Sequence, residues 1–168
     1  MNLAIDIGNS LTHFAVFKGS RMIYAVKYPS SEGIKLVQAI KKLEKNFDID
    51  LIGISSVSPQ TLNHLKTNIR NIFKLYPLTI SNKTKIPINI KVKKSYTLGA
   101  DRICNAVFGY VSSGLKTNIL IIDLGTANTF DLVLKNGDFI GGIIAPGLMT
   151  SSKALNISTF RFPGLMGV

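Results

Sequence analysis

A gap-free internal repeat constrains the fold of this chain more than any other feature of its sequence. The segment 3–23, LAIDIGNSLTHFAVFKGSRMI, aligns with the segment 120–140, LIIDLGTANTFDLVLKNGDFI. The residues of the first copy that meet an identical residue are Leu3, Ile5, Asp6, Gly8, Thr12, Val16, Lys18 and Ile23. Because these matches include aspartate, glycine and threonine, shared strand composition does not explain them, and they indicate a structural duplication. Each copy alternates strands and turns in a way that predicts a three-stranded β-meander.

The segment between the two copies alternates helical and strand patterns. Apolar residues at helical spacing predict helices over 33–46 and 59–74 and a third helix beginning near Ala100, whereas strands are predicted at 50–57 and 77–81, with 86–92 extended but interrupted by Pro87. Pro59 suits a first helical position, and Ser58 before it is a candidate N-cap. The first unit is therefore predicted to be a meander followed by helix, strand, helix, strand and helix, which is an α/β architecture.

Composition limits the class of protein and its partners. With 168 residues and 46% hydrophobic content, the chain can bury a core as one domain or two small ones. The net charge of +11 suits phosphorylated ligands, and because the basic residues are scattered in pairs we do not expect nucleic acid as a partner. No apolar run approaches the roughly 18 residues of a membrane span and no signal-peptide pattern opens the sequence, so we expect a cytoplasmic location and no membrane association. The single Cys104 is expected to be a small buried hydrophobe.

The repeated turn carries residues suited to a nucleotide polyphosphate. Glycine lets the backbone N–H groups approach phosphate oxygens, hydroxyl and amide side chains add neutral donors, and a carboxylate at the strand end can hold Mg²⁺ directly or through water. The first turn supplies Asp6, Gly8, Asn9, Ser10 and Thr12, and the second supplies Asp123, Gly125, Thr126 and Thr129. One such turn alone is typical of a hairpin with a capping aspartate, but its duplication favours a pair of phosphate-binding turns.

Three motifs give the chain a resemblance to a known family. The turns DIGNS and DLGTANT, with the alternating unit between them, resemble the superfamily of acetate and sugar kinases, actin and heat-shock chaperones, which implies a duplicated ribonuclease-H-like fold. More narrowly, GADRICNAVFGY at 99–110 and IDLGTANTFDLVLKNGDFIGGIIAPGL at 122–148 resemble the type III pantothenate kinases. The resemblance implies ATP-dependent phosphorylation of pantothenate, the first step of coenzyme A biosynthesis, by a homodimer.

The resemblance also implies roles for individual residues. Asp101 would be the general base that accepts the proton of the pantothenate hydroxyl, although a carboxylate in a first helical turn also suits the helix dipole. Asp6 would serve the magnesium and phosphate side, Asp123 a site for a monovalent cation (potassium or ammonium), and Thr126 a contact with ATP. The substrate-binding set implied by the motif is Gly99, Ala100, Asp101 and Arg102. His13 and His64 carry no predicted role, and GGIIAPGL is expected to be scaffolding of the cleft.

The repeat predicts a complete first domain over 1–115 and an incomplete second domain over 116–168. Measured against the first copy, the second has its meander and one helix but no counterpart of 52–117. We therefore expect an open sheet edge that a second chain could cover, and low activity. The alternatives to an active kinase are a catalytically impaired fragment and a regulatory or nucleic-acid-binding member of the same family. A second departure is Val92, which stands where the family often has tyrosine.

Overall fold

The computed structural model describes residues 1–114 and 116–158, and the chain forms two compact units. The first unit consists of Met1–Lys85 with Tyr96–Cys104, and the second of Ile86–Ser95 with Asn105–Val168. Helix α3 (Ala100–Ser112) thus contributes its first residues to one unit and its remainder to the other. The division into domains 1–115 and 116–168 stays a prediction, and the terminal part of the second domain, 159–168, lies outside the described residues.

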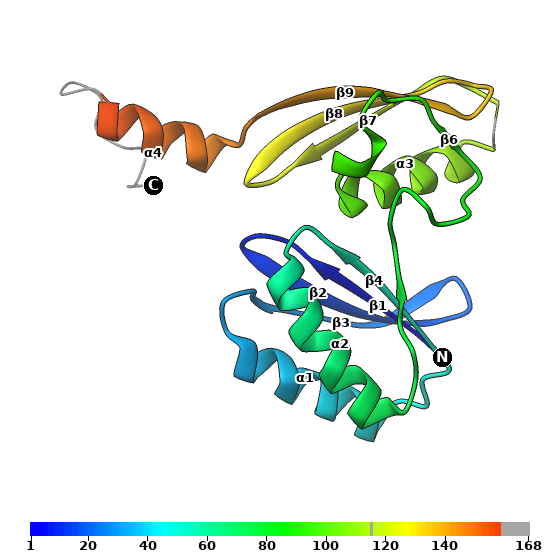
Figure 1. Ribbon diagram of the computed structural model, residues 1–168, viewed down its shortest axis with the longest axis vertical. Coiled ribbons are helices and arrows are strands. Elements are labelled where there is room, and N and C mark those ends of the chain that lie inside the picture. The colour runs from blue at the N-terminus through cyan, green and yellow to red at the C-terminus, as the bar shows by residue number, and fades with distance from the viewer. Residues whose placement is uncertain (115, 159–168) are drawn as a thin grey trace. The chain divides into compact units, whose positions relative to one another are not determined.

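The first unit is built on a five-stranded mixed sheet (Figure 1). Its strands are β1 (Asn2–Ile7), β2 (Leu11–Lys18), β3 (Arg21–Pro29), β4 (Leu51–Ser56) and β5 (Leu78–Thr79). They lie in the order β3-β2-β1-β4-β5, with β1, β2 and β3 antiparallel and β4 and β5 parallel to β1. The predicted meander is confirmed. Parallel strands need a crossover connection, and a helix between β3 and β4 provides the one that leads to β4 beside β1.

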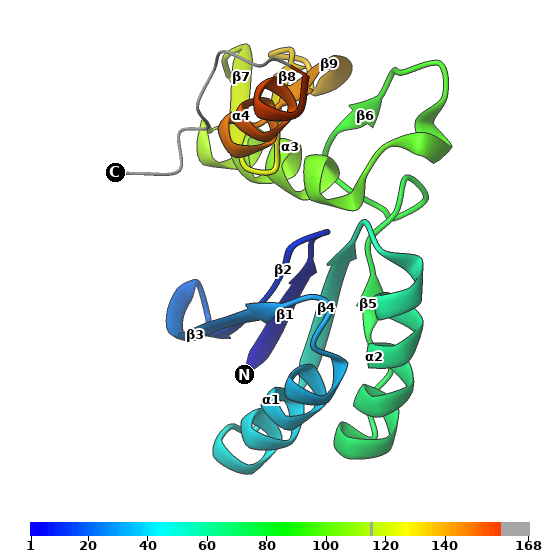
Figure 2. The same cartoon turned by 90° about the vertical axis from the view of Figure 1, so that its left-hand side faces the viewer.

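Helices α1 (Gly33–Asn46) and α2 (Pro59–Phe73) lie on one face of this sheet (Figure 2). The core between them is apolar: Leu3, Ile5, Ile7, Phe14, Val16, Ile52 and Ile54 from strands, and Leu36, Ile40, Leu43, Leu65 and Ile69 from helices. Pro59 occupies the start of α2 as predicted, while the Ser58 hydroxyl pairs with Thr61 Oγ1 at 3.0 Å instead of capping a backbone N–H. Ile34, near the start of α1, is exposed.

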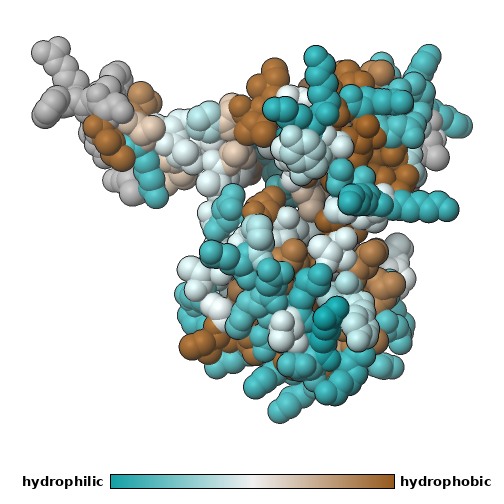
Figure 3. Space-filling model, in the orientation of Figure 1, coloured by the Kyte–Doolittle hydropathy of each residue, from teal (hydrophilic) through white to brown (hydrophobic). Residues whose placement is uncertain are grey.

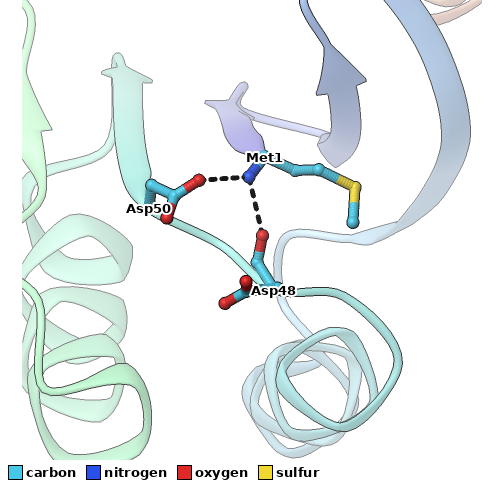
Figure 4. A network of polar contacts seen from close by, with 3 residues as sticks. All are labelled: Met1, Asp48 and Asp50. Atoms are coloured by element: carbon cyan, nitrogen blue, oxygen red, sulfur yellow. Dashed lines mark hydrogen bonds and ion pairs between the residues drawn. The ribbon is translucent and has the colours of Figure 1, made fainter.

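The amino-terminal ammonium group contacts the segment that precedes β4. The ammonium group of Met1 donates to the carbonyl oxygen of Asp48 at 2.7 Å and pairs with Asp50 Oδ2 at 2.5 Å (Figure 4). Asp48 and Asp50 belong to the connection from α1 to β4, so these contacts fix the start of β1 beside the start of β4. Exposed ion pairs of this kind contribute little to stability, so the parallel pairing of β1 with β4 dominates.

The second unit repeats the meander. Its strands are β7 (Ile119–Leu124), β8 (Ala127–Val133), β9 (Asp138–Pro146) and the short β6 (Asn89–Ile90), in the order β6-β9-β8-β7. A 3-10 turn (Ser95–Thr97) precedes α3, and α4 (Leu148–Ser158) follows β9. The antiparallel pairing of β7, β8 and β9 confirms the predicted second meander.

Helix α3 packs on the second sheet through a glycine. A Cβ on Gly109 would lie 3.1 Å from Ile121 Cγ1 and 3.5 Å from Ile119 Cγ2, so this side of the helix approaches β7 closely. Among the apolar residues of α3, Ile103, Ala106 and Tyr110 are buried whereas Val111 is exposed. No helix within the described residues has both the length and the apolar character needed to cross a membrane.

The two meanders differ in the register of their first hairpin. In the first unit Asp6 pairs with His13, but in the second Asp123 pairs with Thr129, the residue that aligns with Thr12. The second hairpin is therefore one residue tighter, although the two sequences align without a gap. The difference lies in the turn: the Gly8 N–H donates to the carbonyl of Leu11, whereas the Gly125 N–H donates to the carbonyl of Ala127.

Candidate active site

In the first unit, polar side chains gather where β1 and β4 end. Asp6 lies next to the last residue of β1 and is in register with Ser55 of β4. Leu3, Ile5 and Ile7 point to the face that α1 and α2 cover, so Asp6 and Ser55 belong to the opposite face. Asp6 is exposed and Ser55 is buried. The carboxyl ends of two adjacent parallel strands therefore present a carboxylate and a hydroxyl side by side.

A buried serine, Ser30, supports the first turn through a hydrogen bond. The Gly8 N–H donates to the Leu11 carbonyl at 3.0 Å, and Ser30 Oγ donates to the Gly8 carbonyl at 2.7 Å. Thr12 is fully buried, with its Oγ1 2.9 Å from Ser30 Oγ. Asn9 and Ser10, at the tip of the turn, are exposed. Of the predicted phosphate-binding residues, Asn9 and Ser10 thus lie at the surface, while Thr12 supports the turn.

The first turn of α3 presents Asp101. Asp101 Oδ1 accepts a hydrogen bond from the Arg102 backbone N–H at 2.8 Å. Gly99 lies directly behind this carboxylate, because a Cβ built on Gly99 would overlap Asp101 Oδ1. Ala100 is buried, whereas Asp101 and Arg102 are half-buried. The absence of a side chain at Gly99 therefore gives the Asp101 carboxylate its place at the start of the helix.

The electrostatics of Cys104 show that these residues lie close together. Burial raises the pKa of the Cys104 thiol, and the charges of Asp6 and Asp101 add to the rise. Because charges act on a thiol appreciably only at short range, the two carboxylates are near neighbours of Cys104. The expectation of a simple buried hydrophobe is corrected: Cys104 is half-buried and lies in a polar cluster.

In the second unit, Asp123 near the end of β7 is bound by a helix side chain. Asn105 Nδ2 of α3 donates to Asp123 Oδ2 at 2.8 Å. Thr129 lies directly across from Asp123 on β8, and its Oγ1 is buried without a hydrogen bond among the described residues. The Asp123 carboxylate, the Thr129 hydroxyl and the Asn105 side-chain amide therefore meet on the same face of this sheet.

The second turn is anchored by the start of α4. The carbonyl of Thr126 accepts from the Gly147 N–H at 3.0 Å and from Thr150 Oγ1 at 2.8 Å. A Cβ on Gly147 would overlap the Gly125 carbonyl, so the last glycine of GGIIAPGL is needed for this close approach. Gly125 and Thr126 are exposed. Their backbone is fixed while Thr126 remains at the surface, which suits a ligand contact.

The residues present fit magnesium bound together with phosphate. Mg²⁺ prefers oxygen ligands, keeps several waters and is usually held by one or two carboxylates plus substrate phosphates. The exposed Asp6 carboxylate beside the first turn provides such a ligand. Within residues 1–114 and 116–158 no group of three His, Cys, Asp or Glu side chains is arranged to hold a metal ion alone. The Asp6 carboxylate therefore fits an ion that also binds substrate phosphates.

A profile for type III pantothenate kinases matches residues 2–166, nearly the whole chain. The chain belongs to the type III pantothenate kinase family. It is 35% identical over 172 residues to a type III pantothenate kinase of Caulobacter vibrioides, which covers 97% of this chain and 65% of the relative. It is also 35% identical to type III pantothenate kinase 1 of Francisella tularensis, covering 92% of this chain and 63% of that protein. The chain thus spans about two thirds of the length of these curated relatives.

Solved structures with similar folds confirm the predicted fold class. A Ppx/GppA family member of Aquifex aeolicus superposes with a TM-score of 0.54 at 12% identity, over 95% of this chain and 54% of that one. The ethanolamine utilization protein EutJ of Carboxydothermus hydrogenoformans gives 0.52 at 10% identity, over 96% and 57%. At these identities the likeness concerns the fold alone, an α/β fold with two sheets of the duplicated ribonuclease-H-like type.

Several residues of the site were not found from the sequence. Asn105 stands in the GADRICNA motif one helical turn after Asp101, and this spacing could have marked it. Ser30 and Ser55 carry no comparable signal, because each reaches the site through a strand pairing that only the folded chain defines. Thr150 likewise reaches the second turn from 24 residues away.

Proposed function

We propose that this chain phosphorylates pantothenate at the expense of ATP. The proposal is carried by two carboxylates of the first unit, the exposed Asp6 near the end of β1 and Asp101 in the first turn of α3. Phosphoryl transfer needs one carboxylate for the metal-bound phosphates and one to accept a proton, and the charges of both raise the pKa of the Cys104 thiol. Membership of the family supports pantothenate as the acceptor. The relatives named type III pantothenate kinase are longer than this chain, and the assay described below tests the activity of the chain itself.

In the proposed mechanism Asp101 is the general base. The acceptor hydroxyl oxygen forms a bond to the γ-phosphorus while the bond from that phosphorus to the bridging oxygen of ADP breaks, and the hydroxyl proton passes to the Asp101 carboxylate. Bound Mg²⁺ would neutralise charge on the phosphate oxygens. Arg102 follows Asp101 in the same helical turn, where its guanidinium suits the substrate carboxylate or the transferred phosphoryl group. Gly99, which has no side chain, would let the backbone approach the substrate, and Ala100 follows it at the start of the helix.

Two further ligands are proposed for the second unit. Thr126, exposed on an anchored turn, contacts ATP, and Asp123 binds a monovalent cation, potassium or ammonium. The Asp123 carboxylate, oriented by Asn105, supports the cation site, as does the Thr129 hydroxyl opposite it, which has no hydrogen bond within the described residues. Carboxylate and hydroxyl oxygens are suitable ligands for such an ion.

We also propose that the protein works in the cytoplasm as a homodimer. Strand β7 is the last strand of the second sheet, and its outer edge has no partner strand within the described residues. Unpaired strand edges favour pairing with another chain. Analytical ultracentrifugation of the purified chain would establish its oligomeric state.

The test is ATP-dependent phosphorylation of pantothenate by the 168-residue chain, with Mg²⁺ and either potassium or ammonium present. Asp101→Asn is expected to reduce kcat by about 10²–10⁴-fold, since it removes the general base. Glu44→Gln, an exposed carboxylate on α1, is the matched control and should leave kcat unchanged. Folded wild-type protein that forms no phosphopantothenate would contradict the proposal and favour the impaired fragment.

A further inference from the structure

The second turn is held by a threonine hydroxyl that the proposed mechanism does not use. Thr150 Oγ1, in the first turn of α4, donates to the carbonyl oxygen of Thr126 at 2.8 Å. The Gly147 N–H donates to the same oxygen at 3.0 Å, and a carbonyl oxygen with its two lone pairs can accept both bonds. Because Thr126 is the residue proposed to contact ATP, the Thr150 hydroxyl acts directly on the backbone of a ligand-binding residue.

The first turn has the same kind of support from a different position. Ser30 Oγ donates to the Gly8 carbonyl at 2.7 Å, and the Ser30 N–H donates to the Ser10 carbonyl at 2.9 Å. When the gap-free alignment of the two copies is continued, Ser30 meets Gly147, whose N–H likewise donates to its turn. A Cβ on Gly147 would overlap the Gly125 carbonyl, so no serine side chain fits there. The second copy instead receives its hydroxyl from the first turn of α4.

The bonds to Thr126 fix the orientation of the peptide group between Thr126 and Ala127. In a trans peptide the C=O and the following N–H point in opposite directions, so a carbonyl held toward the start of α4 turns the Ala127 N–H away from it. Backbone N–H groups attract phosphate oxygens, whereas a carbonyl oxygen repels them. A rotated peptide at this turn would therefore present the wrong pole to a nucleotide.

We propose that Thr150 is a positioning residue for nucleotide binding: its hydroxyl holds the Thr126 carbonyl toward α4 and so keeps the second turn in the form that binds ATP. This inference rests on the proposed function, in which Thr126 contacts ATP. Ser30 supports the first turn in the corresponding way. Such pre-organisation strengthens binding, because the turn is ordered before the nucleotide binds.

The binding test compares Thr150→Val and Thr150→Ser with the wild type in the full chain, by isothermal titration with MgATP. Valine has nearly the shape of threonine but no hydroxyl, and we expect Thr150→Val to raise the Kd for ATP about five-fold, the effect of one lost hydrogen bond. Thr150→Ser retains the donor and should keep the wild-type Kd. A Thr150→Val variant with the wild-type Kd, or a Thr150→Ser variant that binds as weakly as Thr150→Val, would overturn the proposal.

Two control variants lose a hydroxyl without touching the turn. Thr67→Val makes the same chemical change in α2, where Thr67 Oγ1 bonds to the Asn63 carbonyl of its own helix. Ser151→Ala alters the neighbour of Thr150, whose hydroxyl lies 3.5 Å from the Pro146 carbonyl. Both variants should keep the wild-type Kd. Binding weakened equally by Ser151→Ala would mean that any change in α4 has this effect, and it would overturn the specific role of Thr150.

Steady-state kinetics separate positioning from chemistry. Thr150→Val should raise KM for ATP about as much as it raises Kd, while kcat for pantothenate stays close to the wild-type value. The reason is that the proposed base, Asp101, belongs to a different helix from Thr150. A lower kcat with an unchanged KM for ATP would contradict the role in nucleotide binding.

Amide hydrogen exchange examines the turn without any ligand. Thr150→Val should speed exchange of the Gly125 and Gly147 amides, both hydrogen-bonded at the second turn, and leave the Gly8 amide of the first turn unchanged. Unchanged exchange at Gly125 and Gly147 would overturn the proposal. If the wild type binds ATP but forms no phosphopantothenate, the proposed function fails and the Kd comparison still decides the role of Thr150. A wild type that binds no ATP would overturn both.

Discussion

The two meanders share a sequence pattern but bury opposite faces of their first strands. Leu3, Ile5 and Ile7 of β1 are 0–2% exposed, whereas the residues that align with them in β7, Leu120, Ile122 and Leu124, are 53–72% exposed. In the space-filling view, apolar surface is visible on the second unit and along α4 (Figure 3). The same alternation of apolar residues therefore produces a core in one unit and an exposed apolar face in the other.

The helices that pack on each sheet explain the difference. In the first unit α1 and α2 cover the face that carries Leu3, Ile5 and Ile7. In the second unit α3 approaches the other face, which carries Ile119 and Ile121, through Gly109. Helix α4 leaves Leu148, Met149, Leu155 and Ile157 exposed. An apolar strand pattern therefore defines two faces but does not decide which of them a helix will cover.

The largest expected contrast is between Ile5→Ala and Ile122→Ala, which remove the same atoms from aligned positions. Ile5→Ala should lower the free energy of unfolding by about 2–5 kcal/mol, because it opens a cavity in a closed core. Ile122→Ala should change it by less than about 0.5 kcal/mol, as expected for an exposed side chain. Urea unfolding followed by circular dichroism measures both. A similar cost at the two positions would mean that another chain covers the second face in solution.

Glycine substitutions should show a smaller contrast between the sheets. A Cβ on Gly142 of β9 would overlap the Phe130 carbonyl of β8, so Gly142→Ala should destabilise the protein by about 1–3 kcal/mol. Gly53 of β4 has no atom within 4 Å of an added Cβ, and Gly53→Ala should stabilise the protein by about 0.5 kcal/mol. Thermal unfolding of the two variants provides the comparison, and a stable Gly142→Ala variant would contradict the close pairing of β8 with β9.

The aligned threonines of the two hairpins should differ by about 1 kcal/mol. Thr12→Val removes a buried hydrogen bond with Ser30 and is expected to cost about 1 kcal/mol. Thr129→Val removes a buried hydroxyl that has no hydrogen bond in the described part of the chain, so it should cost nothing or stabilise slightly. Urea midpoints of the two variants test the prediction, and equal costs would imply a partner for the Thr129 hydroxyl.

The smallest expected effect concerns the alkylation rate of Cys104, whose pKa is raised by burial and by carboxylates of the first unit. Alkylation by iodoacetamide should be slow near neutral pH, and its rate should rise only above the ordinary pKa of a thiol. The thiol contributes stability that is present below that pKa and is lost as pH rises through the raised value. Asp101→Asn should move the alkylation profile to lower pH, and Asp123→Asn in the second unit should not. A profile at the ordinary thiol pKa would contradict the burial of Cys104 beside two carboxylates.

Local sequence signals predicted most of the fold because they act over a few residues. Helices 33–46 and 59–74 and the strands of both meanders lie where periodicity placed them, with Pro59 at the start of its helix. The tighter second hairpin was not predicted, since a gap-free alignment cannot show a change of turn. Asp101 and Asp123 could be selected because they stand within recognisable motifs, whereas the contacts of Ser30 and Ser55 depend on strand pairing over long separations.

By itself, the sequence determined the duplication, the order of helices and strands, the family and the residue types suited to phosphoryl transfer. Only the tertiary structure decided which face of each meander is buried, which polar group supports each turn and which neighbours surround Cys104. The physical reason is that periodicity and turn chemistry are properties of neighbouring residues, while burial and hydrogen bonding depend on which distant segments pack together. Aligned residues with the same side chain, such as Thr12 and Thr129, therefore lie in different surroundings.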